Sequence, residues 1–299
     1  MSDAADHRPR ALAAWVAVCV IWGTTYLAIR IALETVPPGL LAGLRWTAAG
    51  ALLALAVRLA GRRLPPPRAW ASLALAGFLM TVMGNGLVVW AEQHVSSGLA
   101  AVMVAMVPIW SVLIEAVRGR GERFTVQVGT GLLMGFGGIV VLVWPELQPG
   151  GGGRLFVIGM VALQLACAGW ALGSSTTKHQ DSGADPVATS ALQMLFGGLM
   201  LVVIGSASGE WSQLQVTPRT LGALVYLALV GSIVGYTCYV YALTHLPISL
   251  VSLYAYVNPI IAVVLGSLLL GEPFTLRMLV ASGLVLAGIA VVRRAKVSS

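Results

Sequence analysis

Two long apolar segments of the same design set the strongest limit on what this chain can fold into. The segment from Ser249 to Thr275 is apolar over roughly the 20 residues that a helix needs to cross a bilayer, and it carries Asn258 and Pro259 near its middle. A second segment, from Ser97 to Thr125, carries Pro108 near its middle, and both end in a charged turn containing Gly-Glu. Their recurrence in two parts of one chain predicts a duplicated membrane protein.

The composition excludes a soluble globular protein. Of the 299 residues, 58% are hydrophobic and 10% are charged, and the mean hydropathy is +0.88, so there is too little polar surface to cover a water-soluble fold. The basic residues behind the pI of about 9.8 are spread over short loops, which indicates membrane topology rather than a nucleic-acid surface. Cys19, Cys167 and Cys238 fall inside apolar segments and offer neither a disulfide framework nor a metal-binding pattern.

Apolar segments bounded by proline, glycine or charge predict an all-α integral membrane protein with ten transmembrane helices. The apolar runs are continuous rather than alternating, which excludes a β-barrel. The first run is too long for the core of a cleaved signal peptide, so we expect it to stay in the protein. The expected spans are 11–32, 38–60, 69–92, 97–116, 125–144, 154–177, 187–205, 219–242, 248–270 and 275–293.

Lysine and arginine predict the orientation of these helices. With the amino terminus inside, thirteen basic residues fall on inner flanks and four on outer flanks, which places both termini in the cytoplasm. The expected location is the inner membrane of a bacterium. The four on outer flanks are Arg30, Arg154, Arg219 and Arg277. Arg45 is the one basic residue expected well inside a span.

The sequence repeats with a shift of about half its length. A shift of 148 pairs Trp22 with Trp170, and a shift of 151 pairs Gly84 with Gly235. The same shifts also pair Cys19 with Cys167, Arg30 with Lys178, Arg45 with Gln193, His94 with His245, and Pro108 with Pro259. Each repeat, 1–149 and 150–299, holds five expected helices. Because five is odd, the second repeat must enter the membrane in the opposite orientation, which is an architecture of alternating-access transporters with a central cavity.

With its Trp22-Gly23 pair, its mid-helix Pro108 and Pro259, and the Gly-Glu turns after them, the chain resembles the EamA branch of the drug/metabolite transporter superfamily over nearly its whole length. Within that branch it is similar to aromatic amino-acid exporters of the YddG type. The resemblance implies a ten-helix bundle around a central cavity and export of small metabolites from the cytoplasm. Related small multidrug exporters carry a glutamate in the middle of the first helix. The stretch from Trp22 to Tyr26 has none, which disfavours export of lipophilic cations.

The residues expected at the cavity are polar, aromatic or soft side chains placed at mid-depth. Each has a structural alternative: the prolines could serve helix packing, the aromatic and methionine faces could be core, and Asn85 could bond another helix. Arg45 could bind carbonyls or attract a carboxylate. The expected cavity residues are Trp22, Tyr26, Arg45, Asn85, Met103, Met106, Trp110, Trp170, Tyr236, Tyr239, Tyr254 and Asn258, and the expected kinks are at Pro108 and Pro259.

The positions of the acidic residues indicate whether transport could be coupled to protons. All of them, Glu92 among them, lie in expected loops or near helix ends, so no carboxylate is expected to relay protons through the middle of the membrane. We therefore expect facilitated movement of the cargo down its own gradient. The turns containing Glu122 and Glu272 are expected to cap the helices that follow them.

The favoured function is a secondary transporter that exports amino acids, neutral and aromatic ones above all. Its expected partners are this small-molecule cargo and the lipid bilayer, with no nucleic acid, and a monomer is plausible. Organic phosphates, nucleotide sugars or drugs are alternative cargoes, and an intramembrane enzyme is a distant alternative. No P-loop, HExxH or nucleophile-elbow motif is found, so we expect no enzyme, no cofactor and no metal.

Overall fold

The structure, a computed structural model, describes residues 3–119, 126–144, 153–179, 185–272 and 275–295. Within these ranges the chain is helical with short connections and no strand, which confirms the all-α class. The first part contains α1 (Asp3–Ala32), α2 (Pro38–Leu59), η1 (Pro67–Ala69), α3 (Trp70–Gly77), η2 (Phe78–Gly86), α4 (Leu87–Ala91), α5 (Ser97–Val104), α6 (Val107–Val117) and α7 (Val126–Val143). The second contains α8 (Gly153–Lys178), α9 (Pro186–Ala207), η4 (Glu210–Ser212), α10 (Pro218–Tyr226), η5 (Leu227–Val234), α11 (Gly235–His245), α12 (Ile248–Val251), α13 (Tyr254–Leu270) and α14 (Leu276–Ala295).

Seven helical stretches of the described residues are long and apolar enough to cross a membrane. They are His7–Ala32, Pro38–Leu59, Pro67–Ala91, Ser97–Val117, Gly153–Lys178, Pro186–Ala207 and Pro218–His245. The other three expected spans correspond to α7, to α12 with α13, and to α14. The count of ten therefore stays a prediction.

Local sequence explains where several helices begin. Proline occupies the first helical position of α2, α9 and α10, where a missing backbone N–H costs nothing. The Asp185 side chain accepts hydrogen bonds from the first turn of α9, and Thr217 forms a capping box with Thr220 at the start of α10. These caps fix where the chain turns from loop to membrane helix.

The third long segment of each half changes its helical winding at matching positions. The π-helices η2 and η5 interrupt Pro67–Ala91 and Pro218–His245 respectively, and each is followed directly by α-helix. Single π segments occur often at functional sites because they displace side chains from the regular helical faces.

The two prolines act differently in their helices. Pro108 lies in the first turn of α6, just after the chain has left helical geometry between Val104 and Val107. Pro259 lies inside α13, and the break in that segment comes earlier, between α12 and α13. The expectation of equivalent kinks at the two prolines is therefore wrong in detail.

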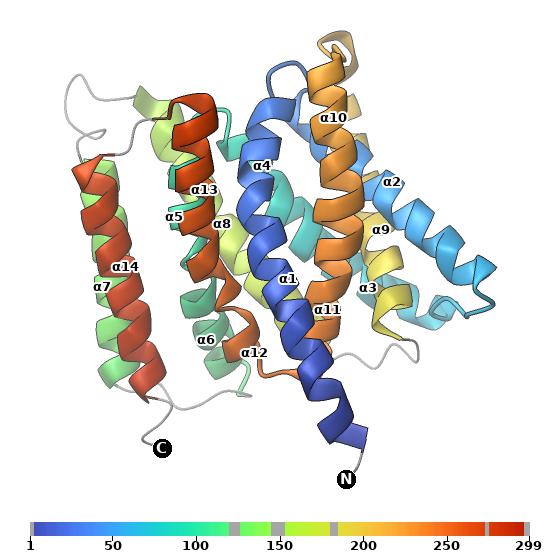
Figure 1. Cartoon of the computed structure of the whole chain (residues 1–299), viewed down its shortest axis with the longest axis horizontal. Coiled ribbons are helices and arrows are strands. Elements are labelled where there is room, and N and C mark those ends of the chain that lie inside the picture. Colours follow the sequence, from blue (N-terminus) through green and yellow to red (C-terminus); the bar gives the residue numbers. More distant parts are fainter. Residues whose placement is uncertain (1–2, 120–125, 145–152, 180–184, 273–274, 296–299) are drawn as a thin grey trace.

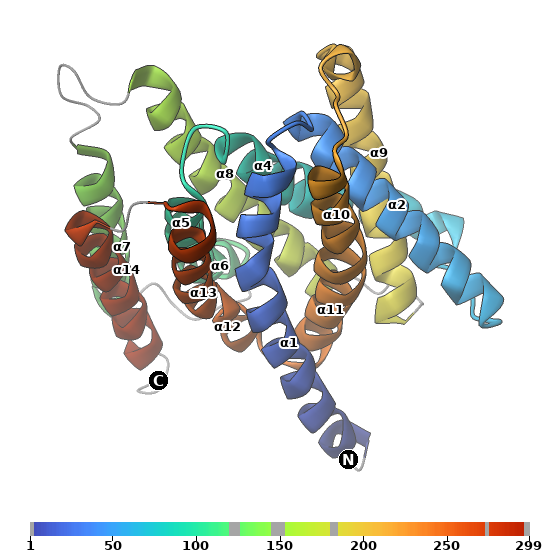
Figure 2. The ribbon, with the colours of Figure 1, turned by 45° about the horizontal axis from the view of Figure 1, so that its top comes forward.

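The helices form a broad bundle with a tight pair at each side. α2 lies beside α9 at one side and α7 beside α14 at the other, and both termini leave from the same end of the bundle (Figures 1 and 2). The α2–α9 pair depends on glycine: a Cβ added to Gly198 would lie 2.3 Å from the Thr47 backbone nitrogen, and one on Gly50 would lie 2.4 Å from that of Leu195. Small residues allow such close backbone approach in membrane helices.

The turn after α13 corrects one expectation. Glu272 does not cap α14. Its carboxylate accepts hydrogen bonds from the Ser97 backbone N–H (3.0 Å) and hydroxyl (2.7 Å) and from the Gly98 N–H (3.3 Å), at the start of α5. A carboxylate at a helix N-terminus is stabilised by the exposed N–H groups and the helix dipole. Glu272, in the second half, is therefore hydrogen-bonded to the start of α5 in the first half. Glu122 lies outside the described residues.

Candidate functional site

A cavity lies among the middle parts of α1, α2, α8 and α13 and the third and fourth segments of the first half. Its volume is about 60 Å³, which is enough to hold water. Seven of the expected residues line it: Trp22, Tyr26, Arg45, Asn85, Trp170, Tyr254 and Asn258. The other lining residues are Thr25, Ile29, Trp46, Gly84, Val88, Val104, Val107, Ala166 and Cys167. The lining is thus aromatic and apolar with a few polar groups, as is usual for small-molecule sites.

An aromatic cluster closes the cavity toward the end of the bundle where the termini lie. The ring of Trp22 packs edge-on to Trp170 and Tyr254, with centroids 5.2 and 5.0 Å apart, and lies tilted against Tyr239 at 5.0 Å. Trp46 joins it through an edge-on contact with Tyr236 at 5.3 Å. We call these six residues, Trp22, Trp46, Trp170, Tyr236, Tyr239 and Tyr254, the aromatic layer.

Protein groups bond the polar atoms of five residues of the aromatic layer, Trp22, Trp46, Trp170, Tyr236 and Tyr239. Trp22 donates to the Gly231 carbonyl at 3.0 Å, and Trp170 donates to the Tyr239 hydroxyl at 3.1 Å. That hydroxyl also bonds the Ser174 hydroxyl at 2.7 Å. Because buried indole N–H and phenol O–H groups need partners, these bonds fix the ring orientations. Four of the six residues, Trp22, Trp46, Trp170 and Tyr254, line the cavity as a preorganised wall.

Asparagine side chains hold two walls of the cavity in place. Asn85 accepts a hydrogen bond from the Trp46 indole at 2.8 Å. The amide nitrogen of Asn258, in the orientation that satisfies the amide, donates to the carbonyls of Cys19 and Tyr254 at 3.1 Å. Both asparagines therefore also make the interhelical or intrahelical bonds of the structural alternative.

Arg45 brings a positive charge into the cavity wall. Its side chain is 2% exposed, its Nε donates to the Ser232 hydroxyl at 3.1 Å, and its guanidinium carbon lies 4.7 Å from the Trp46 ring centre. Nη1 is buried without a hydrogen-bond partner. A buried, incompletely bonded guanidinium is a strong binding group for a carboxylate. The expected alternative, in which Arg45 binds backbone carbonyls, finds no such contact among the described residues.

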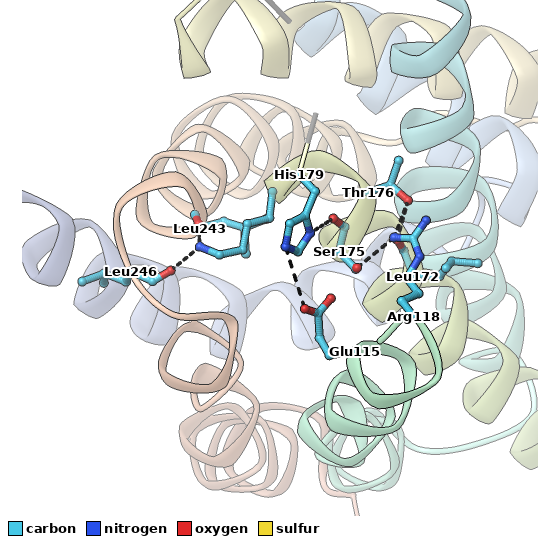
Figure 3. Close-up of polar contacts among 9 residues, drawn as sticks. Glu115, Arg118, Leu172, Ser175, Thr176, His179, Leu243 and Leu246 are labelled. Carbon is cyan, nitrogen blue, oxygen red and sulfur yellow. Dashed lines mark hydrogen bonds and ion pairs between the residues drawn. The ribbon is translucent and has the colours of Figure 1, made fainter. Parts of the chain in front are cut away.

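A second polar cluster lies beyond the aromatic layer, at the end of the bundle where the termini lie. Figure 3 shows Arg118, directly after α6, donating to the hydroxyls of Ser175 (2.8 Å) and Thr176 (3.3 Å) on α8. The Glu115 carboxylate lies 4.0 Å from the His179 ring nitrogen. Lys178 donates to the carbonyls of Leu243 and Leu246 at 2.9 and 2.8 Å. These contacts tie α6, α8 and α11 together below the cavity.

Four of the expected residues lie away from the cavity wall on the first-half side. Met103 and Met106 are fully buried in the core, and the adjacent residues Val104 and Val107 line the cavity instead. Trp110 donates to Gln164 on α8 at 3.1 Å. Pro108 is buried at the start of α6. For this segment the expected face was wrong, because the break between α5 and α6 changes which side chains point inward.

On the second-half side, three more expected residues do not line the cavity. Pro259 lies in a separate apolar groove between α5, α13 and α14. Tyr236 and Tyr239 stand behind the wall in the aromatic layer, where Tyr236 donates to Gln193 at 3.1 Å. Cavity lining by the kink at Pro259 is therefore wrong, whereas Tyr254 and Asn258 do line the cavity.

Sequence reasoning missed Trp46 and Glu92. Trp46 was available as a tryptophan in mid-span beside Arg45, but its counterpart at a shift of 148 is Met194, so the repeat gave no signal. Glu92 directly follows α4, as expected from the sequence, yet it is fully buried. Glu92 thus lies at a helix end, as expected, and its burial by other helices is the feature that sequence reasoning did not foresee.

Comparison with known proteins decides the family. Residues 10–144 and again residues 157–294 match the EamA-like transporter family. The chain belongs to this family. The prediction of an EamA-type transporter is thereby confirmed, and the family domain occurs twice in this EamA-like transporter.

Relatives of this EamA-like transporter share its full length. The uncharacterized inner membrane transporter YedA of Escherichia coli is 36% identical, over 94% of this chain and 89% of YedA. A probable terminal-alkyne amino-acid exporter of Streptantibioticus cattleyicolor is 27% identical, over 95% of this chain and 94% of that one. A crystal structure matches with a TM-score of 0.67 at 21% identity, over 95% and 96% of the two chains, which supports the fold.

Proposed function

We propose that this EamA-like transporter exports amino acids, neutral and above all aromatic ones, and related small metabolites from the cytoplasm by alternating access. The observation that carries the proposal is the cavity that joins a buried guanidinium, Arg45, to the aromatic layer. A cargo carboxylate would pair with Arg45, and an aromatic side chain would stack against Trp22 and Trp170. The name of the S. cattleyicolor relative, a probable amino-acid exporter, agrees with this cargo class. YddG-type specificity is part of the proposal.

The cavity in this state is too small for an aromatic amino acid, so the proposal requires movement. Ligand pockets commonly measure about 300–1,000 Å³. At the end of the bundle where the termini lie, a few polar contacts join the helices. They are the hydrogen bonds from Arg118 to α8 and the Glu115–His179 pair (Figure 3). We expect these to open when the cavity exposes its cargo to that side, while the capping of α5 by Glu272 helps hold the opposite side.

The same proposal includes ten transmembrane helices in two inverted repeats, 1–149 and 150–299, with both termini in the cytoplasm of a bacterium and the helices in its inner membrane. Reciprocal contacts support it. Gly84 lies against Trp170, and their counterparts Gly235 and Trp22 lie against each other in the same way. Reciprocity between elements of two halves is what a two-fold relation produces.

Counterflow in liposomes tests the function. Proteoliposomes loaded with unlabelled phenylalanine, threonine or a sugar phosphate are placed in a trace of the labelled compound, and uptake is followed over time. We expect phenylalanine to exchange best and the sugar phosphate not at all, since Arg45 is the one charged side chain in the cavity lining. Exchange of the sugar phosphate alone would refute the amino-acid proposal and favour organic phosphates. Chemical conversion of the cargo would favour an enzyme.

A further inference from the structure

Glu92 is a carboxyl group that the fold does not use. It is the first residue after α4, its side chain is fully buried, and neither carboxyl oxygen has a hydrogen-bond partner. An ionised carboxylate without donors in such a place loses its hydration with nothing in return. The neutral, protonated acid is the form that fits this environment.

Charged groups around Glu92 come from several elements. Arg30 donates to the Glu92 backbone carbonyl rather than to its carboxyl group. Burial raises the pKa of Glu92 well above its ordinary value, and the charge of Glu272 raises it further, while Arg30 and Arg45 act in the opposite direction. The titratable or charged groups on the elements packed around this site are Tyr26 and Arg30 on α1, Arg45 on α2, Cys167 on α8, Glu272 after α13, and His94 in the same turn.

The second half shows what this position needs for folding alone. Lys178, the counterpart of Arg30, donates to the Leu243 carbonyl as Arg30 donates to that of Glu92. A shift of 151 pairs Glu92 with Leu243, and Leu243 is also fully buried. A basic side chain at the C-terminal carbonyls of a helix is thus common to both halves, and an apolar side chain suffices there. The fold therefore does not need the carboxyl group of Glu92 at this position.

Arg45 is a second charged side chain whose counterpart in the other half is uncharged. Gln193 pairs with Arg45 at a shift of 148 and is satisfied on both sides, since it donates to Thr177 at 3.0 Å and accepts from Tyr236 at 3.1 Å. Arg45 keeps an unpaired Nη1 at the cavity. Val88, one turn before Glu92 on the same segment, lines the cavity as well. Among the described residues, the first half thus carries an incompletely bonded guanidinium and an unpartnered carboxyl group where the second half has Gln193 and Leu243.

We infer that Glu92 is a proton-binding site whose occupancy sets how strongly Arg45 attracts a cargo carboxylate. When the proton is bound, Arg45 carries an unbalanced positive charge and takes the carboxylate. When the O–H bond of Glu92 breaks, the proton passes to solvent, and the carboxylate left behind partly balances the charge of Arg45 and weakens its attraction for the cargo. Proton and cargo carboxylate therefore bind cooperatively. The cargo arm of this inference rests on the proposed amino-acid function.

The proton site is tested without any cargo. Infrared difference spectra of the full chain in lipid nanodiscs are recorded during a pH titration, for the wild type, Glu92→Gln, Glu92→Leu and Glu34→Gln. Glu34 is half-exposed and paired with Arg219 at 3.2 Å, so it is the matched control. We expect one carboxyl group whose pKa lies above the range of an ordinary glutamate, and we expect both Glu92 variants to lack it. If the Glu92 variants keep every titrating band of the wild type, the inference is overturned. Glu92→Leu copies Leu243, so it guards against a folding failure.

The link to the cargo is tested by exchange kinetics. We expect the KM for phenylalanine exchange to fall as pH is lowered through the titration of Glu92, by up to about tenfold per pH unit for one linked proton. Glu92→Gln should exchange with a low KM that does not vary over this range, and phenylethylamine, which lacks the carboxylate, should compete without this pH dependence. A wild-type pH profile in Glu92→Gln would overturn the link. Absence of any amino-acid exchange would instead refute the proposed function and leave the infrared result to decide on the proton site.

Discussion

Gly84 lies against the six-membered ring of Trp170 with no room for a side chain between them. A Cβ on Gly84 would lie 2.8 Å from Cε3 of Trp170, and one on Gly235 would lie 2.5 Å from Nε1 of Trp22. Each half therefore supplies the glycine on which the tryptophan of the other half rests. The positions of both cavity walls depend on two missing methyl groups.

Gly84→Ala is expected to lower the free energy of unfolding by about 1–3 kcal/mol, the usual cost of overpacking a core, because a ring held by a hydrogen bond must move. Thermal unfolding followed by tryptophan fluorescence measures the loss. Gly222→Ala on α10 is the matched control, since a Cβ there meets nothing within 4 Å. Equal stability of the two variants would contradict the prediction.

Tyr239→Phe is expected to destabilise the protein by about 1–3 kcal/mol, because the Trp170 indole N–H and the Ser174 hydroxyl each lose a buried partner. Unfolding in denaturant measures the change. Tyr241→Phe removes a hydroxyl that bonds His7 at 3.0 Å in a half-buried position, so it should cost clearly less. The reverse order would show that the aromatic layer does not depend on this hydrogen bond.

Arg45→Gln, which copies Gln193, is expected to raise the KM for phenylalanine exchange by about 10- to 100-fold, the loss of one charge-assisted hydrogen bond to a carboxylate. Inhibition by phenylethylamine should change little. Arg219→Gln, at an exposed ion pair with Glu34, is the control and should leave KM unchanged. An Arg45→Gln protein with the wild-type KM would remove Arg45 from the binding site.

Stability should depend on pH through Glu92. Its pKa is raised in the folded state, mainly by burial, so between the unfolded and folded pKa values the folded protein holds a proton that the unfolded chain has lost. The contribution of Glu92 to stability is therefore complete below about pH 4, the unfolded value, and is lost by about 1.4 kcal/mol per pH unit as pH rises through this window. Unfolding of the wild type and Glu92→Gln at several pH values tests this, and we expect the difference to shift in favour of Glu92→Gln as pH increases. A constant difference would contradict it.

Glu272→Ala is expected to cost about 0.5–2 kcal/mol, the value of a helix cap, although Glu272 and the capped helix α5 are far apart in sequence. Ser97→Ala removes one of the three hydrogen bonds and should cost part of this. If the double variant is no less stable than Glu272→Ala alone, the two residues act as one unit, as the geometry requires. Full additivity would argue against the cap.

The sequence predicted what depends on composition and on the repeat. Apolar runs predicted the helical membrane fold, and Trp22 and Trp170 were found because the two halves repeat them. What it could not give were features set by contacts between halves. The capping of α5 by Glu272 joins distant segments, and the break after Val104 turns Met103 and Met106 away from the cavity. Glu92 lies at the expected helix end, but its burial comes from packing by other elements.

The charged groups at and near the cavity make the two halves of the transporter electrostatically unlike. Arg45 and Glu92 correspond in the sequence repeat to Gln193 and Leu243 of the other half, which are uncharged. A cargo entering from either side would therefore meet different electrostatic potentials, even where the helices on the two sides match. Under the proposed alternating access, duplication would supply two similar gates, and divergence at two positions would make the free-energy profile along the path uneven.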